Sequence, residues 1–317
     1  MANSGITNKI LSLSPYLEIL FRKIYWRNRK LMSRFKKANP QKGNLKKFEK
    51  IKDQLDDFGV KKGDILVLHA SYEMLEGTGK LPKQIIEELL DLLGTTGTLA
   101  MNSSRAFPEE KIKGDYLNAN YNDLIVNYNV HKSRVWTGVL PFFMLKHKDA
   151  KISRFPINPI VAVGFHAERM IENNIKGKLN SSCGFNSSWK YCVDNNAVIV
   201  GLGTDLTHSL TIMHVAEEIM GDKWLVKDWF RERQFRVVDN DFDEIITVNE
   251  RNPQWGCLHF AERTLCKDLI NSGILKTATI DGVLVEVINS KELISFLNSK
   301  NKNGYPYFNF KKNDIRI

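Results

Sequence analysis

The sequence contains no apolar run long enough to cross a lipid bilayer, which takes about 20 residues. Its apolar runs, such as Ile65–Ala70, are far shorter. Residues 1–10 are polar, and Ser12 and Pro15 interrupt the apolar stretch that follows, so the pattern of a secretory signal is missing. We therefore expect a cytoplasmic protein.

Cysteine is scarce, with four in 317 residues and no close pair of the zinc-ribbon kind. We expect reduced, structural thiols and no metal. The sequence also lacks a Gly-Lys-Ser/Thr phosphate loop, a His-Glu-x-x-His zinc motif and a Gly-x-Ser-x-Gly nucleophile elbow. These absences argue against P-loop nucleotide hydrolysis, zinc-dependent proteolysis and serine hydrolase chemistry.

Acidic residues are outnumbered, since 46 Lys and Arg face 36 Asp and Glu, which gives a net charge of +10. A basic protein attracts nucleic acid, anionic lipid, coenzyme A and nucleotide-sugars, and it repels polycations. The hydrophobic share of 43% and the charged share of 26% are those of an ordinary globular protein.

Residues 1–43 form a basic N-terminal extension in which aromatic side chains lie between lysines and arginines. No acid stands among the basic residues from Arg22 to Lys42. Such a helical segment can lie on an anionic membrane surface or follow a nucleic-acid backbone. Alternatively, it packs its apolar stripe on the body or on a second copy of the chain, and its charges face water.

The pattern of residues 44–300 predicts a single α/β domain with a central mixed sheet flanked by helices, followed by a tail at 301–317. A strand, a helix and a second strand follow one another between residues 65 and 101, which is the rhythm of a βαβ unit. Residues 107–151 are expected to form long loops that line a site. The predicted helices are 48–58, 82–93, 161–171, 210–220, 257–272 and 291–297, and the predicted strands are 65–70, 98–101, 197–203, 235–239, 245–249, 275–280 and 283–288.

The segment 211–218 carries the most suggestive chemistry. His214 stands in the first turn of a predicted helix, where the helix dipole favours the neutral imidazole, which can accept a proton. Glu217 or Glu218 lies three or four positions later, on the same helix face, and can orient the ring. The structural alternative is an ordinary His–Glu pair.

The loop from Ser71 to Gly79 follows the first predicted strand. Its hydroxyls and backbone N–H groups near a helix start could hold a pyrophosphate. His69, at the end of that strand, reads by itself as a structural histidine.

Several segments together resemble the aminoglycoside 3-N-acetyltransferase family (antibiotic N-acetyltransferases). In order they read Gly-Asp-Ile-Leu-Val-Leu-His-Ala-Ser (63–71), Gly-Thr-Leu-Ala-Met (97–101), Val-Ala-Val-Gly (161–164), Cys-Gly-Phe-Asn-Ser-Ser-Trp (183–189), Val-Ile-Val-Gly-Leu-Gly (198–203) and Thr-Ile-Met-His-Val-Ala-Glu (211–217).

The resemblance implies a cleft for acyl-CoA, acetyl or longer, and an amine acceptor that enters from the other side. It makes His214 the catalytic base, with Glu217 beside it. The cofactor contacts it suggests lie at the first two strand ends and in the loop between, at His69, Ser71, Gly77, Thr78, Asn102 and Ser103. Many members carry an Arg-Ser pair shortly before His-Pro, whereas this chain reads Ile-Ser-Arg-Phe-Pro at 152–156.

The net charge decides the expected acceptor. Since aminoglycosides are polycations and the chain is basic, we expect a nucleotide-linked amino sugar of the kind used for surface polysaccharides. The alternative is aminoglycoside 3-N-acetylation, as in antibiotic resistance. A further alternative is a basic protein that binds membrane surfaces or nucleic acid through its extension, although nucleic acid is not an expected partner.

Overall fold

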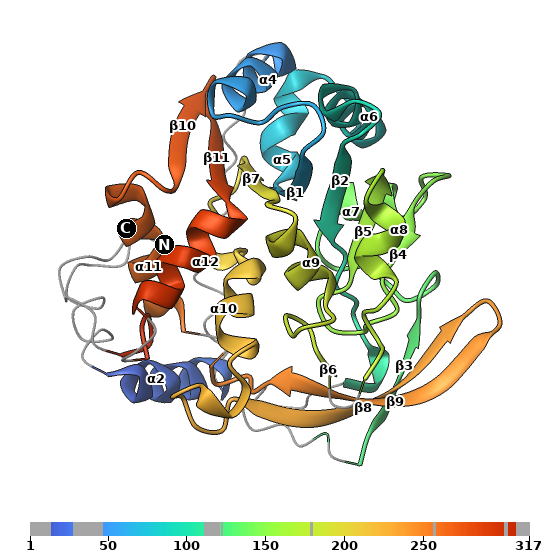
Figure 1. Ribbon diagram of the computed structural model, residues 1–317, viewed down its shortest axis with the longest axis vertical. Coiled ribbons are helices and arrows are strands. Elements are labelled where there is room, and N and C mark those ends of the chain that lie inside the picture. The colour runs from blue at the N-terminus through green and yellow to red at the C-terminus, as the bar shows by residue number, and fades with distance from the viewer. Residues whose placement is uncertain are drawn as a thin grey trace.

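The computed structural model describes residues 14–27, 47–110, 121, 123–177, 180–255, 258–300 and 304–308. Its centre is a seven-stranded mixed sheet in the order β10-β11-β7-β1-β2-β5-β4 (Figure 1). Strands β7, β1 and β2 are parallel, with Leu66 opposite both Val198 and Leu99, and the other pairings are antiparallel. The strands are β1 (Ile65–Ala70), β2 (Thr98–Asn102), β4 (Lys151–Ile152), β5 (Ile160–Gly164), β7 (Val198–Leu202), β10 (Lys276–Ile280) and β11 (Val283–Asn289).

Both faces of this sheet are covered. Leu66 and Leu68 point into one core together with α4 and α6, and Ile65 and Val67 point into a second core with α8, α9, α11 and α12. A strand buried on both faces needs apolar residues at every position, which explains the continuous apolar run of β1. The helices are α4 (Phe48–Asp57), α5 (Tyr72–Leu75), α6 (Pro82–Leu93), α7 (Val139–Met144), α8 (Ala167–Ile171), α9 (Ser188–Asp194), α10 (Val215–Glu218), α11 (His259–Asn271) and α12 (Ser290–Lys300).

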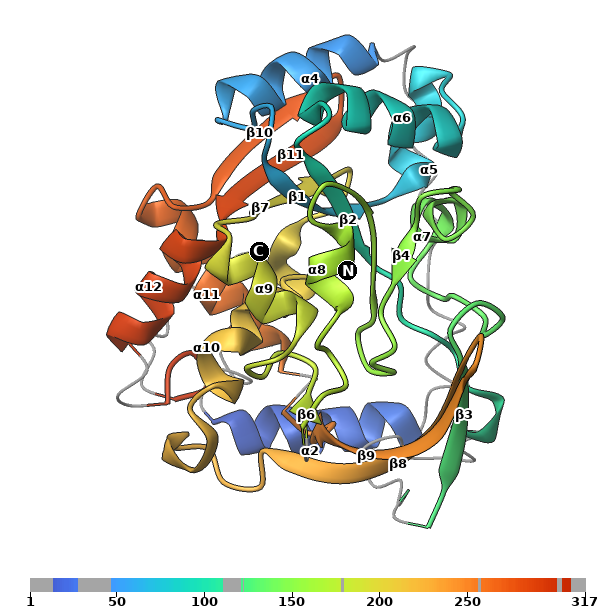
Figure 2. The ribbon, with the colours of Figure 1, turned by 45° about the vertical axis from the view of Figure 1, so that its right-hand side comes forward.

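A second sheet in the order β3-β8-β9-β6 curves beneath the carboxyl ends of β1 and β2 (Figure 2). Its long hairpin pairs Phe230 with Arg251 at one end and Asp239 with Phe242 at the other. The strands are β3 (Ile125–Asn129), β6 (Asn180–Ser181), β8 (Phe230–Asp239) and β9 (Phe242–Arg251). The α/β class with a mixed sheet flanked by helices is therefore confirmed, and the second sheet is an addition to it.

Two predicted helices are wrong in part. The range 161–171 contains most of β5 followed by α8. Strand β5 pairs with β2 and is buried on both faces. Its apolar run therefore lacks the alternation of apolar and polar residues that would distinguish a strand from a helix. The range 210–220 is a 3-10 turn at Thr211–His214 followed by the short helix α10.

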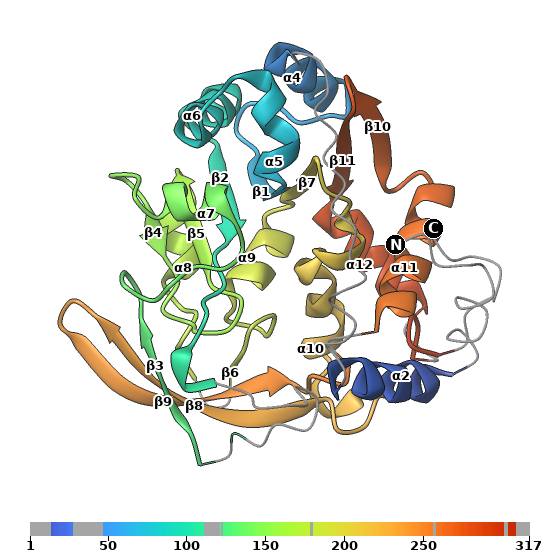
Figure 3. The ribbon, with the colours of Figure 1, turned by 180° about the vertical axis from the view of Figure 1, so that it is seen from behind.

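Helix α2 (Pro15–Arg27) confirms a helix in the N-terminal extension. It lies beside the second sheet in all views (Figure 3). Its Ile19 packs into an aromatic cluster with Trp224, Trp229, Trp255 and Tyr307. Most of the basic stretch that follows α2 lies outside the described residues. Within the described part of the chain, no helix has the length and apolar character that a membrane span requires.

Candidate active site

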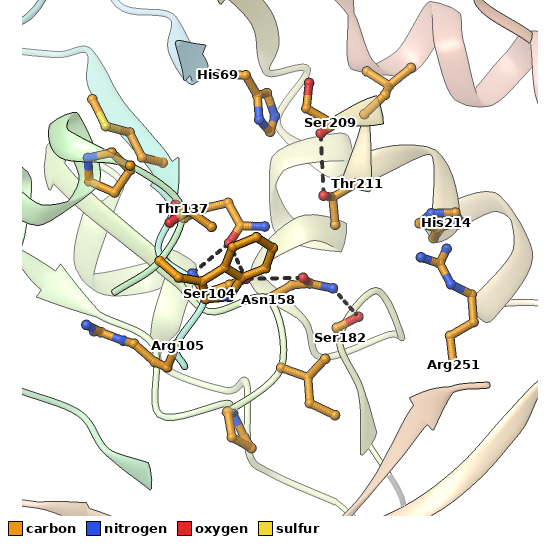
Figure 4. Close-up of a pocket in the computed structure, with 18 of the residues that line it drawn as sticks. His69, Ser104, Arg105, Thr137, Asn158, Ser182, Ser209, Thr211, His214 and Arg251 are labelled. Carbon is orange, nitrogen blue, oxygen red and sulfur yellow. Dashed lines mark hydrogen bonds between the residues drawn. The ribbon is translucent and has the colours of Figure 1, made fainter. Parts of the chain in front are cut away.

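A cavity of about 910 Å³ lies between the carboxyl ends of β1, β2 and β7 and the second sheet. Because the carboxyl ends of parallel strands meet at one edge, loops from distant parts of the chain converge there. Figure 4 shows His69, Ser209, Thr211 and His214 along one side of this space and Arg105 and Ser104 along the other.

His214 stands in the cavity wall, at the end of the 3-10 turn, and is paired with Glu217. Its Nδ1 lies 2.6 Å from Glu217 Oε2, and both side chains are buried. Glu217 lies three positions later in helix α10, on the face that meets the ring. Glu218, the other predicted partner, instead accepts a 2.8 Å hydrogen bond from the Cys183 N–H. Nε2 is thus the ring nitrogen left for a substrate.

Burial governs the protonation of the pair. It lowers the pKa of His214 well below its ordinary value, and the nearby Arg251 cation lowers that pKa further. Burial also raises the pKa of Glu217 to about 8, against the opposing influence of Arg251 and of a hydrogen bond from Tyr307. The sequence predicts a neutral imidazole from the helix dipole. In the structure, exclusion from water is the largest cause of the lowered pKa of His214.

Arg251 and Tyr307 are two neighbours of the pair that the sequence did not reveal. Arg251 ends β9 and lines the cavity, and the Tyr307 hydroxyl donates to Glu217 Oε1 over 3.1 Å. They lie far from the pair in sequence, so neither periodicity nor spacing could have found them.

Two of the predicted cofactor contacts, His69 and Asn102, line the same cavity. The His69 ring stacks on Trp189, with centroids 6.4 Å apart. Its buried Nε2 has no hydrogen-bond partner within the described structure, and burial lowers its pKa to about 4. Asn102 Oδ1 accepts hydrogen bonds from the Ser104 N–H and hydroxyl.

The other four predicted contacts, all of them described residues, do not line the cavity. The Ser103 hydroxyl donates to the Pro159 carbonyl, and the Thr78 hydroxyl to the Leu75 carbonyl. Gly77 lies with Thr78 in a 3-10 turn, and Ser71 precedes helix α5. A role for these four residues in cofactor binding stays a prediction.

The region 107–151 contributes to the cavity as expected, although it also contains β3 and α7. Trp136 lines the cavity and is 67% exposed. The loop that carries it is fixed to β2 and the residues after it, since the Trp136 N–H donates to the Ser104 carbonyl and the Thr137 hydroxyl to the Asn102 carbonyl. No sequence motif marked this loop.

Carboxylates outnumber cations among the lining residues. Arg105 and Arg251 stand against four acids, Glu110, Glu218, Glu250 and Glu262. Arg233, which does not line the cavity, pairs with Glu110 and Glu250 from behind. Arg231 also pairs with Glu250, so two arginines in the wall and two behind it balance the four lining carboxylates. The wall thus offers carboxylate groups within a chain whose net charge is positive.

A protein-family model described as aminoglycoside 3-N-acetyltransferase matches residues 67–300. The aminoglycoside N(3)-acetyltransferase III of Serratia marcescens is 27% identical over 175 residues, which cover 54% of this chain and 64% of that enzyme. The matched part thus spans less than two thirds of the relative.

Solved structures share the fold. The binary complex of AAC-IIIb with CoASH aligns with a TM-score of 0.62 at 19% identity, covering 80% of this chain and 95% of that one. AAC-VIa bound to sisomicin aligns with a TM-score of 0.62 at 15% identity, covering 81% and 98%.

These matches contradict the predicted nucleotide-linked amino-sugar acceptor, because the family model and the curated relative both point to aminoglycosides. The error came from the charge of the whole chain. Residues 1–47 hold twelve of the 46 Lys and Arg but one of the 36 Asp and Glu, so the rest of the chain is nearly neutral. With more than half of its length matched by the family model, this chain belongs to the aminoglycoside 3-N-acetyltransferase family.

Proposed function

We propose that this chain is an acetyl-CoA-dependent aminoglycoside 3-N-acetyltransferase with His214 as general base. The observation that carries the proposal is the buried His214–Glu217 pair in the wall of the cavity, within a chain of this family. Residues 44–300 are the proposed catalytic domain.

The proposed reaction needs one proton acceptor. Nε2 of neutral His214 takes a proton from the substrate amine as its nitrogen attacks the thioester carbonyl carbon. A C–N bond forms, and the tetrahedral intermediate then collapses with loss of the C–S bond. The imidazolium returns its proton to the departing thiolate, so the products are an amide and free coenzyme A. The hydroxyls of Ser209 and Thr211 lie between His69 and His214 in Figure 4, and they now donate to the Asp205 and Ser209 carbonyls. Either hydroxyl would have to exchange this long hydrogen bond for one to the oxyanion in order to stabilise it.

Glu217 fixes the orientation of the ring. By accepting the Nδ1–H, its carboxylate sets the tautomer in which Nε2 carries the free lone pair, and it stabilises the imidazolium that forms. The carboxylate is held on both oxygens, by His214 and by Tyr307.

The proposed acyl donor is acetyl-CoA, in keeping with the CoASH complex of the AAC-IIIb structure. The wall near His69 and Asn102 offers hydroxyl, amide and backbone groups suited to a pantetheine chain. The rates with longer acyl-CoAs test this choice of donor, because a pocket that is shaped for an acetyl group would exclude a longer acyl chain.

The proposed acceptor is a polycationic aminoglycoside. The carboxylates of the cavity wall can pair with the ammonium groups of such a substrate, and the net positive charge of the chain lies in residues 1–47 rather than in the part that forms the cavity. Contact of that extension with a membrane or with a second copy stays a prediction outside the proposed reaction, as does a cytoplasmic location.

The test measures thiol release from acetyl-CoA with a panel of aminoglycosides, and identifies the acylated amine by NMR. We expect His214→Ala to lower kcat by two or more orders of magnitude, the size of a lost general base. The matched control is His131→Ala, because His131 also pairs with a carboxylate, Asp239, at 2.9 Å but lies outside the cavity wall.

Turnover that survives in His214→Ala, or that falls equally in the control, would reject His214 as the base. Absence of thiol release with every aminoglycoside would reject the proposed activity itself.

A further inference from the structure

The segment 304–308, beyond the residues matched by the family model, sends one side chain into the interior beside the proposed catalytic pair. Tyr307 is 2% exposed, and its hydroxyl lies 3.1 Å from Glu217 Oε1. The other oxygen of the same carboxylate, Oε2, faces His214 Nδ1 at 2.6 Å. The three side chains thus form one hydrogen-bonded chain from Tyr307 through Glu217 to His214.

The Tyr307 ring is held by three tryptophans. Its centroid lies 6.3 Å from that of Trp224, 5.4 Å from that of Trp229 and 6.2 Å from that of Trp255, all in edge-to-face geometry. Ile19 of α2 belongs to the same cluster. Rigid packing of this kind fixes where a hydroxyl points before any substrate binds.

Charged groups from several elements act on this arrangement. Arg251 of β9 and Glu262 of α11 act electrostatically on both Tyr307 and His214. Arg251 also acts on Glu217, and Glu218 of α10 also acts on His214. Burial and the Glu217 carboxylate raise the pKa of the Tyr307 hydroxyl well above its ordinary range, so it remains a donor at working pH. Its hydrogen bond lowers the pKa of Glu217.

We propose that Tyr307 is a positioning residue of the acetyl transfer, which acts through Glu217 to hold His214 as an oriented base. The inference rests on the proposed role of His214. It makes part of the predicted C-terminal tail a component of the site, although Tyr307 does not line the cavity.

Tyr307→Phe tests this, because the ring and its packing remain while the hydrogen bond is lost. We expect kcat at pH 7 to fall about tenfold, with little change in the KM for acetyl-CoA or in the KM for the aminoglycoside. The rising limb of the kcat–pH profile should move about one pH unit to the alkaline side, the size expected when a charged acceptor loses a hydrogen bond.

Tyr305→Phe is the matched control. It removes a buried hydroxyl from the same segment, one that donates to Asp268 over 2.8 Å, away from the pair. If the segment 304–308 has only a structural role, both variants should lose similar stability, and neither should shift the rising limb of the kcat–pH profile.

A second variant keeps the inference testable if Tyr307→Phe does not fold. Site-specific fluorotyrosine at position 307 keeps the ring and makes the hydroxyl a stronger donor, so the limb should move to the acid side. A limb that stays in place in either folded variant overturns the inference. If His214→Ala leaves kcat unchanged, the proposed function fails instead, whatever Tyr307 does.

Discussion

At the scale of single residues, the coupled protonation of His214 and Glu217 determines when the base is available. Below the raised pKa of Glu217, about 8, the pair keeps an additional proton, and Nε2 is protonated. Above it, the carboxylate accepts the Nδ1–H and Nε2 is free. We therefore expect kcat/KM for acetyl-CoA to rise with pH, to reach half of its maximum near pH 8 and to level off about one to two pH units higher.

The variant Glu217→Gln separates the titration of the His214–Glu217 pair from that of the acceptor amine. A neutral amide has no carboxyl proton to lose, so the rise of kcat/KM with pH that is due to Glu217 should vanish. Any rise that is due to deprotonation of the amine should remain. An unchanged profile in Glu217→Gln would show that the pair does not set the pH dependence.

The sequence predicted this site in part. His214 and Glu217 lie three positions apart, so local spacing was enough to suggest their contact, but it could not choose between Glu217 and Glu218. In the structure Glu218 is occupied by the Cys183 N–H, a partner from a distant part of the chain, which leaves Glu217 to His214. Arg251 and Tyr307 reach the pair only through tertiary packing, which leaves no local signal.

At the scale of elements, strand β5 shows where sequence patterns fail. Elements with one buried face have readable periodicity. Helix α6 was predicted over its full range, and about half of each strand of the β8–β9 hairpin was predicted, at 235–239 and 245–249. Strand β5 is buried on both faces, and its end is marked by Gly164, which has a φ of +123°.

Gly164→Ala tests the packing at this strand end. An added Cβ would lie 2.3 Å from the Gly97 carbonyl oxygen and 2.8 Å from Thr98 Cα, both rigid backbone. The control is Gly138→Ala, where φ is +121° and no atom lies within 4 Å, so only the conformational cost of roughly 1–3 kcal/mol applies.

We expect Gly164→Ala to lower the thermal midpoint at least twice as much as Gly138→Ala, measured by circular dichroism. Equal losses would mean that the backbone at β2 moves aside freely.

At the scale of the whole molecule, charge is segregated along the chain. The cavity wall holds four carboxylates that can receive a cationic substrate, whereas residues 1–47 carry the positive excess. Since salt screens attraction as well as repulsion, the KM for an aminoglycoside should rise about threefold or more between 0.05 and 0.5 M KCl. A KM that falls with salt would show that the net charge of +10 governs binding after all.

A variant with glutamine at Arg29, Lys30, Arg34, Lys36 and Lys37 serves as the control for this measurement. It removes half of the net charge at positions outside the described residues and leaves every described residue of the cavity wall unchanged, so its KM should keep the same salt dependence. Loss of that dependence would place the extension in the binding reaction.

The pairing of β1 with β7 has a consequence for the nascent chain. Strand β1 can pair with β2 soon after both are synthesised. Its other neighbour, β7, in which Val198 pairs with Leu66, follows much later in the chain. Until then an apolar strand edge stays open to intermolecular pairing. We therefore expect the chain to be most prone to aggregation between the synthesis of β1 and that of β7. Conditions that delay β7 should lower the yield of folded protein before they lower the catalytic rate of the folded molecules.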